Sequence, residues 1–173
     1  MAIRKIREEG DALLLKKSRP VTEFNPRLHE LIDDMRDTLL NAGGVGLAAP
    51  QVGVLRRVVL VMDTLKEELS DEEQIIELVN PEIIERDGTQ TDPEGCLSVP
   101  GVYGLVERPY HVRVRAQDRF GNTFEVEGEE LTARCFCHEI DHLDGHLFTE
   151  LATRILSDEE LEEYRNKQRE KEN

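Results

Sequence analysis

The sequence predicts an α+β fold, with antiparallel strands packed around a central helix and one further helix near each end of the chain. Three observations support this fold: apolar residues at helical spacing near the N-terminus, short β-branched runs in the middle, and a later helical pattern that carries two histidines. Helices at the ends with strands between them are typical of the α+β class. A length of 173 residues predicts one domain spanning residues 1–173.

The first helix is predicted over residues 26–42. Asn25 is a favourable N-cap, Pro26 suits the first helical position, and apolar residues then recur at helical spacing. Gly43 and Gly44 end the pattern, as glycines after a helix commonly do.

Four runs rich in β-branched residues follow and are predicted as strands. They cover residues 54–62, 78–84, 112–116 and 123–126. The last two are joined by residues 118–122, which predict a hairpin turn. The acidic stretch 66–73 is interpreted as a solvated loop or a short helical turn.

Two further helices are predicted near the C-terminus. Residues 129–144 carry Cys135, His138 and His142 at helical spacings and stop at Gly145, and we expect them to form the central, metal-binding helix. From Ser157 onward, a Ser-x-x-Glu capping box opens a helix whose acids come first and whose basic residues come later.

Composition excludes several classes of protein. Lys and Arg number 22 against 37 Asp and Glu, a formal net charge of −15, and aromatic residues are only 5%, so direct nucleic-acid binding is not expected. No apolar run approaches the ~18 residues that a membrane span needs, and the charged start does not resemble a signal peptide. We therefore expect a cytoplasmic protein that does not contact a membrane, with three cysteines as free thiols or metal ligands.

Residues 138–142 have the H-E-x-x-H pattern of metal-dependent hydrolases. Four residues make just over one helical turn, so His138 and His142 project from one face and can bind one ion, with Glu139 beside them. Two unrelated surface histidines are the alternative interpretation. A catalytic site of this kind also needs a third protein ligand.

Cys96 is the best candidate for that third ligand. It lies in the segment Glu-Gly-Cys-Leu-Ser at 94–98, which glycine allows to approach another backbone closely, although a buried structural cysteine is the alternative. His146 is expected to be an ordinary histidine, because three donors on successive turns span about 12 Å of helix. Cys135 and Cys137 are expected to be core or partly buried thiols beside the site.

The glycine-rich segment 44–51 is not a phosphate-binding loop, since it lacks the Gly-Lys-Ser/Thr ending and contains Pro50. Its small apolar residues leave room for another chain to lie close. Gln51 at its end supplies a side-chain amide donor.

Together these segments resemble the peptide deformylase family. That family has the motifs Gly-hydrophobic-Gly-hydrophobic-Ala-Ala-x-Gln, matched at 44–51, Glu-Gly-Cys-hydrophobic-Ser, matched at 94–98, and Gln-His-Glu-x-x-His, matched at 138–142. The likeness runs from Ile3 to Phe148. One position departs from the pattern, because Cys137 stands where the family has Gln before the first histidine.

The resemblance implies a metal-dependent hydrolase that removes the N-formyl group from the initiator N-formylmethionine of nascent polypeptides and releases formate. It implies one divalent metal ion on Cys96, His138 and His142, which is Fe²⁺ by analogy with the family. Intrinsic affinity alone would favour Zn²⁺ over Fe²⁺, and Ni²⁺ or Co²⁺ also suit such ligands. The implied partners are N-formylmethionyl nascent peptides. The later basic residues of the C-terminal helix (157–173) offer a surface for transient ribosome contact, and a solvated charged face is the alternative interpretation that composition favours.

The chemistry assigns further roles. Glu139 is expected to accept a proton from water and deliver it to the leaving amine. Gln51 and, by analogy with the family, the backbone N–H of Leu97 are expected to stabilise the developing oxyanion. The peptide is expected to lie extended near Val45 and residues 100–101 as an added strand. The expected substrate-binding residues are Gly44, Val45, Gly46, Glu94, Gly95 and Cys135.

Two other functions fit parts of the sequence. An H-E-x-x-H zinc peptidase shares the helical motif but does not require Cys96. A non-catalytic metal-binding or redox protein would instead use Cys135 and Cys137.

Overall fold

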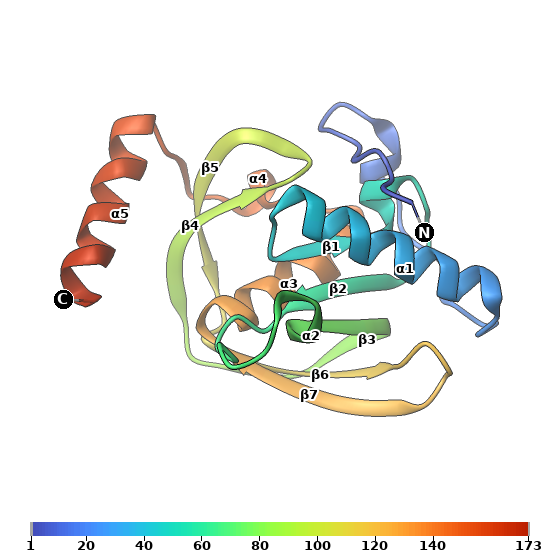
Figure 1. Ribbon diagram of the computed structural model, residues 1–173. Helices are drawn as coiled ribbons and strands as arrows, with labels where there is room; N and C mark the ends of the chain where they lie inside the picture. The colour runs from blue at the N-terminus through green and yellow to red at the C-terminus, as the bar shows by residue number, and fades with distance from the viewer. Residues whose placement is uncertain (1, 173) are drawn as a thin grey trace.

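Two antiparallel sheets lie around helix α3 in the computed structural model, which describes residues 2–172 (Figure 1). The larger sheet has the order β1-β2-β3-β6-β7, formed by Gly46–Ala48, Val58–Met62, Ile75–Asp87, His111–Gln117 and Thr123–Glu129. The smaller sheet has the order β4-β5-β8, formed by Gln90–Cys96, Val99–Arg108 and Arg154–Ile155. The α-helices are α1 Pro26–Ala42, α2 Asp71–Gln74, α3 Glu130–Leu143, α4 Phe148–Leu151 and α5 Asp158–Glu172, and the 3₁₀ helices are η1 Ala12–Leu15 and η2 Ala49–Val52. The predicted α+β class is confirmed.

Strand β2 shows how the larger sheet separates two cores. All five of its residues are buried, because successive side chains alternate between the two faces of the sheet and both faces are covered. Val58, Leu60 and Met62 join the cluster that includes the apolar face of α1. Val59 and Val61 join the cluster that includes α3. The sheet therefore holds α3 on the face opposite to α1.

Helix α1 has the predicted bounds, and both end signals act as expected. The Asn25 side chain accepts a hydrogen bond from the backbone N–H of Leu28, and Pro26 occupies the first turn. Gly43 ends the helix in the left-handed conformation, with φ of 71°.

Helix α3 is almost enclosed, since eleven of its fourteen residues are buried. It begins directly after β7 and ends before Gly145, close to the predicted range of 129–144. Gly145 has φ of 80°, and a Cβ there would lie 2.5 Å from the backbone oxygen of Leu15. A glycine is therefore needed at position 145, both for the turn that follows α3 and for the close packing of the N-terminal segment around Leu15.

All four predicted strands have different bounds in the structure: the strand predicted at 112–116 gains one residue at each end, and the other three differ by three residues or more. The strand predicted at 54–62 begins only at Val58, because the residues before it pair with Arg19 instead of with the sheet: Arg56 forms a bridge with Arg19, and the Arg57 N–H donates to the carbonyl of Arg19. The strand predicted at 78–84 extends over Ile75–Asp87, pairing first with β2 and then with β6. It bends at Asn80, which has φ of 51°. The last strand extends beyond residue 126 to Glu129, and the hairpin at 118–122 is confirmed.

The β4–β5 hairpin is the main element that the strand prediction missed. The sequence predicted no strand between residues 84 and 112, because prolines and glycines interrupt the β-branched pattern there. In the structure β4 and β5 pair from Gln90 opposite Arg108 to Cys96 opposite Val99, which leaves Leu97 and Ser98 as a tight turn. Cys96 is thus the last residue of a strand.

Helix α5 differs from the other long helices because none of its residues is buried. Its start is capped as predicted, with the Glu160 N–H donating to Ser157 Oγ at 3.2 Å. The Tyr164 hydroxyl donates to the carbonyl of Thr91 on β4 at 3.1 Å. The short α2 fits the predicted helical turn in the acidic stretch. Among residues 2–172, no helix combines the length and hydrophobicity that would let it cross a membrane.

Candidate metal centre and active site

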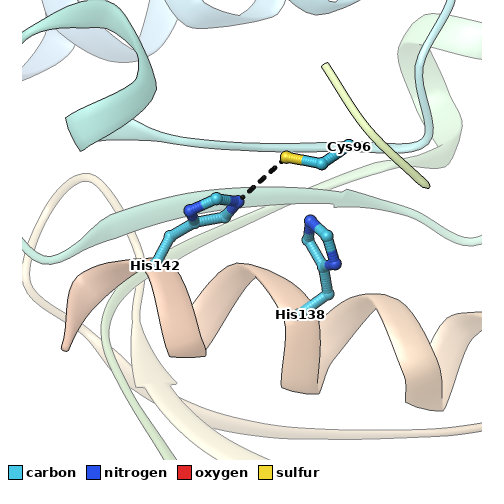
Figure 2. A group of neighbouring side chains, drawn as sticks. All are labelled: Cys96, His138 and His142. Atoms are coloured by element: carbon cyan, nitrogen blue, oxygen red, sulfur yellow. Dashed lines mark hydrogen bonds between the residues drawn. The ribbon is translucent and has the colours of Figure 1, made fainter. Parts of the chain in front are cut away.

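The fold brings Cys96, His138 and His142 together (Figure 2). Their ligand atoms all lie within 4.8 Å of one another, and the Cys96 Sγ is 3.3 Å from His142 Nε2. Both histidines are buried and the cysteine is half-buried. In Figure 2 the two imidazoles rise from α3 and Cys96 approaches them from the other side.

The two histidines converge because four residues make just over one turn of α3. Their ring centroids are 4.9 Å apart, with the ring planes at 74°. Cys96 reaches them because β4 ends at the tight turn before β5. The predicted meeting of a strand-borne sulfur with two nitrogens of one helix is therefore present in the geometry.

The donor set fits a divalent metal ion. One sulfur and two imidazole nitrogens are ligands that zinc and ferrous iron both accept. The sulfur faces two hydrogen-bond donors, the Ser98 backbone N–H at 3.4 Å and Gln51 Nε2 at 3.6 Å, which fix its position at the end of β4. Burial lowers the pKa of His142 well below its usual value, and His138 adds to this effect, so His142 is held in the neutral form that binds metals.

Glu139 lies beside the three candidate ligands with one oxygen free. It is buried, and its Oε1 has no hydrogen-bond partner within residues 2–172. Burial raises the pKa of Glu139 to about 7, while His138 opposes this rise and Glu94 adds to it. A carboxyl group of this kind is suited to exchange a proton near neutral pH.

Gly46 leaves the space that the Glu139 carboxyl occupies. A Cβ at position 46 would collide with the Glu139 side chain. A side chain at Gly44 would likewise lie 2.9 Å from Leu97 Cδ1. The glycines of the 44–51 segment are therefore needed for close contact with α3 and with the β4–β5 turn.

Gln51 is held in one orientation by two hydrogen bonds. Its Oε1 accepts from the Ala48 backbone N–H at 2.9 Å, and its Nε2 donates to Ser98 Oγ at 3.0 Å. The side chain is almost completely buried, yet it borders the cleft described below. The predicted amide donor therefore points toward the candidate ligands.

A cleft of about 510 Å³ opens onto these residues. It is bordered by Gln51, Cys96, Leu97, His138 and Glu139 from the predicted catalytic and ligand sets. All six residues expected to bind substrate also border it: Gly44, Val45, Gly46, Glu94, Gly95 and Cys135. Residues 100–101, where the sequence predicted an extended peptide, lie on the same cleft.

Glu94 has an additional role that the sequence did not reveal. Its carboxylate contacts His138 Nδ1 and accepts hydrogen bonds from Arg108 Nη2 and Arg134 Nη1, each at 2.7 Å. Burial opposes ionisation, but the bonds from His138 and Arg108 prevail and hold the pKa of Glu94 well below its usual value. The carboxylate is therefore committed to these buried partners even though the residue borders the cleft.

The remaining cysteines and His146 lie outside the ligand group. Cys135 and Cys137 are buried in the apolar cluster around α3, as expected. Burial raises the pKa of Cys137 to about 11 and raises that of Cys135 further, so both are neutral thiols. His146 is exposed and bonds to Glu150 at 3.1 Å.

A second group of possible ligands, Glu85, Asp87 and His111, lies on the surface. His111 already contacts Asp87 and Glu127 with its two nitrogens, and Arg113 neutralises part of the group. In the described part of the chain, Cys96 and His138 of the first group border the cleft, whereas none of the second group does.

Comparisons with known proteins find one family along most of the chain. A family model described as polypeptide deformylase matches residues 3–157. A peptide deformylase of Caldicellulosiruptor bescii is 54% identical over 167 residues, which cover 96% of this chain and 96% of that protein. A peptide deformylase of Acetivibrio thermocellus is 51% identical over 172 residues, which cover 99% of this chain and 96% of that protein.

Solved structures show the same likeness. The crystal structure of a peptide deformylase from Legionella pneumophila matches with a TM-score of 0.80 and 44% identity, covering 95% of this chain and 92% of that chain. The peptide deformylase from Thermotoga maritima matches with a TM-score of 0.81 and 37% identity, covering 88% of this chain and 99% of that chain. The family match ends at residue 157, immediately before α5.

Proposed function

The chain belongs to the peptide deformylase family, and from that premise we propose that Cys96, His138 and His142 hold the divalent metal ion that the family uses. The protein is a metal-dependent hydrolase that removes the N-formyl group from the initiator N-formylmethionine of nascent polypeptides and releases formate. The observation that carries the ligand proposal is the meeting of one sulfur and two nitrogens beside a carboxyl group with a free oxygen.

Glu139 carries the proton in this proposal. When bound, the metal lowers the pKa of water toward ~7 and polarises the formyl carbonyl. Glu139 Oε1, which has no partner within residues 2–172, accepts a proton from the water that attacks the formyl carbon. The same carboxyl group then protonates the amine nitrogen as the carbon–nitrogen bond breaks, leaving formate and a free N-terminus.

Gln51 and Leu97 stabilise the negative charge that develops on the formyl oxygen. The amide of Gln51 is already oriented by Ala48 and Ser98, so it loses little freedom in the transition state. The backbone N–H of Leu97 lies in the tight turn that follows Cys96 and supplies a second donor. Losing one such donor typically costs ~2.7–4 kcal/mol of transition-state stabilisation.

The substrate peptide lies along strand β1 in this proposal. Within the described sheet, β1 is an edge strand that pairs with β2 alone, so its other edge can accept an extended peptide. Gly46 begins this edge, Gly44 and Val45 precede it in the chain, and Glu94, Gly95 and Cys135 border the same cleft. Main-chain pairing tolerates different side chains, so many nascent sequences can be accepted.

The identity of the metal is part of the proposal. We assign Fe²⁺ by analogy with the family, although the ligand types alone favour Zn²⁺. Metal analysis of anaerobically purified protein, with activity assays of iron- and zinc-loaded forms, tests this assignment. An enzyme that is fully active with zinc and indifferent to air would contradict it.

We propose that residues 1–173 form one catalytic domain, because the cleft is bordered by elements from α1 to α3. The cytoplasm is the proposed location, as the site of nascent chains that carry N-formylmethionine. Transient ribosome contact through the basic end of α5 remains a proposal that rests on the exposure of that helix.

Formate release from formyl-Met-Ala-Ser tests the proposed mechanism directly. The wild-type enzyme should release formate, and Glu139→Ala should lose activity by about 10²–10⁴-fold because it lacks the proton carrier. A variant that keeps wild-type activity would contradict the role of Glu139. Cleavage of unformylated internal peptide bonds would favour the zinc peptidase alternative, and reversible disulfide formation between Cys135 and Cys137 without hydrolysis would favour the redox alternative.

A further inference from the structure

A buried cluster of charged residues lies behind His138. Its members come from the β4–β5 hairpin and from α3: Glu94 from β4, Arg108 from β5, and Arg134 and Asp141 from α3. The side chains of Glu94, Arg108 and Arg134 are each 4–5% exposed. Buried charges are costly unless they are paired, so this cluster needs its complete set of contacts.

Arg108 is the centre of the cluster. Its Nη2 and Nε donate to the two oxygens of Glu94, at 2.7 and 3.2 Å. Its Nη1 donates to Asp141 Oδ2 at 2.6 Å. The planar guanidinium group therefore joins β4 to α3 through three directed bonds, a geometry that a lysine cannot reproduce.

The partner of Arg108 is also the partner of His138. Glu94 Oε1 accepts from Arg108 and contacts His138 Nδ1. This contact orients the imidazole and leaves its other nitrogen for the ion, as carboxylate partners of metal-binding histidines commonly do. His142 has no equivalent support, because its Nδ1 has no hydrogen-bond partner in the described part of the chain.

Arg108 does not reach the substrate. The cleft is bordered by Glu94, Arg134 and His138, but neither Arg108 nor Asp141 contributes to its lining. Any influence of Arg108 on the reaction must therefore pass through Glu94 or through α3.

We infer that Arg108 is a positioning residue of the metal centre. It holds Glu94 against His138 and ties Asp141, from the same helix as both histidines, to strand β5. This inference rests on the proposed function, in which His138 is a metal ligand. A purely structural role would instead make Arg108 important for stability and irrelevant to metal binding.

Arg108→Met and a matched control separate these two roles. Arg119 is the control, because it also pairs with two acids, Glu77 and Asp33, but lies at the β6–β7 hairpin away from the cleft. Zinc affinity of each purified variant is measured by competition with a chelator, together with the melting temperature and the separate values of kcat and KM.

Arg108→Met should weaken zinc binding by ~10–100-fold, the range typical for the loss of such supporting contacts. It should lower kcat and leave KM unchanged, because Arg108 does not border the cleft. Arg108→Lys should restore part of the zinc affinity, since it keeps the charge but not the three directed bonds. Arg119→Met should lower the melting temperature without changing zinc affinity.

Unchanged zinc affinity in Arg108→Met, or an equal loss in Arg119→Met, would overturn the inference. If Arg108→Met does not fold, Asp141→Asn replaces it, with a smaller loss of zinc affinity expected and no loss as the contrary result. Cys96→Ser tests the premise separately. If Cys96→Ser binds zinc as tightly as wild type, the proposed ligand set is wrong. If Cys96→Ser binds zinc more weakly while Arg108→Met keeps the wild-type zinc affinity, only the role of Arg108 is rejected.

Discussion

Helices α3 and α5 have nearly the same length, 14 and 15 residues, but opposite surroundings. Eleven residues of α3 are buried, and it contacts strands of both sheets. None of the residues of α5 is buried, and it lies at the edge of the molecule in Figure 1. Both helices could be predicted from sequence, so local signals alone do not distinguish a helix that carries chemistry from one that does not.

The two helices differ in which of their side chains are buried away from water. The apolar residues of α3 pack against β2 and β6, which buries His138, Glu139 and His142 with them. Charged groups in such a place interact strongly because water does not screen them. In α5 the charged residues remain solvated and make only weak pairs. If this comparison is right, substitutions in α3 should lower the stability or the activity strongly, and changes in α5 should have only small effects on both.

The largest effect on stability is expected from Phe136→Ala. Phe136 is completely buried in the α3 cluster, so its truncation removes apolar contacts and leaves a cavity. The free energy of unfolding should fall by ~3–5 kcal/mol, measured by urea denaturation. Leu161→Ala in α5 is the matched control and should change it by less than ~1 kcal/mol. Equal losses in the two variants would break the comparison.

Removal of the metal should have the next largest effect. An ion held by Cys96, His138 and His142 joins α3 to the end of β4, so it stabilises the folded state only. With free metal at 100 times its dissociation constant, the loss on chelation is ~2.7 kcal/mol. Thermal unfolding with and without chelator measures this change. A melting temperature indifferent to chelation would contradict a link between the two elements.

Gly46→Ala should disturb the site from strand β1, which lies against Glu139 of α3. The added Cβ would meet the Glu139 carboxyl, and overpacking of this kind costs ~1–3 kcal/mol. Formate release should fall together with stability, because Glu139 must move. Gly10→Ala is the control, since its backbone is strained at φ of 103° but no atom lies within 4 Å of the added Cβ. That control should lose stability only, and a Gly46→Ala enzyme with full activity would refute the close contact.

The smallest effect is expected from ending the chain at Ser157, which removes α5. Arg165 of this helix lies 5.6 Å from the centre of the Tyr103 ring at the cleft, a contact worth ~0.5–1 kcal/mol at an exposed site. The shortened enzyme should therefore keep most of its formate release, with KM raised by no more than ~5-fold. Loss of folding or of most of the activity would contradict this weak contribution of α5 to the cleft.

The sequence predicted elements well where local chemistry decides them. Asn25, Pro26 and Gly43 define the ends of α1, and the histidine spacing places both imidazoles on one face of α3. The sequence did not predict elements whose existence depends on pairing with a distant or irregular strand. Strand β5 contains Pro100, Gly101 and Gly104, which obscure a strand pattern that only its pairing with β4 reveals.

The candidate site shows the same division. The motifs identified Cys96, His138 and His142 individually, but their convergence depends on the β4–β5 register, which no local signal contains. Arg108 was missed because the sequence predicted no element at its position, and an arginine is normally exposed to solvent. Its burial becomes understandable only when Glu94 and Asp141 are placed around it.

The cobalt-substituted enzyme provides the most direct test of the central claim, that one thiolate and two histidines share an ion. Absorption spectroscopy should show a thiolate-to-cobalt charge-transfer band in wild type and in Cys135→Ser, because Cys135 lies outside the ligand group. The band should disappear in Cys96→Ser. A spectrum without that band in wild type, or a band that survives in Cys96→Ser, would contradict the proposed metal centre.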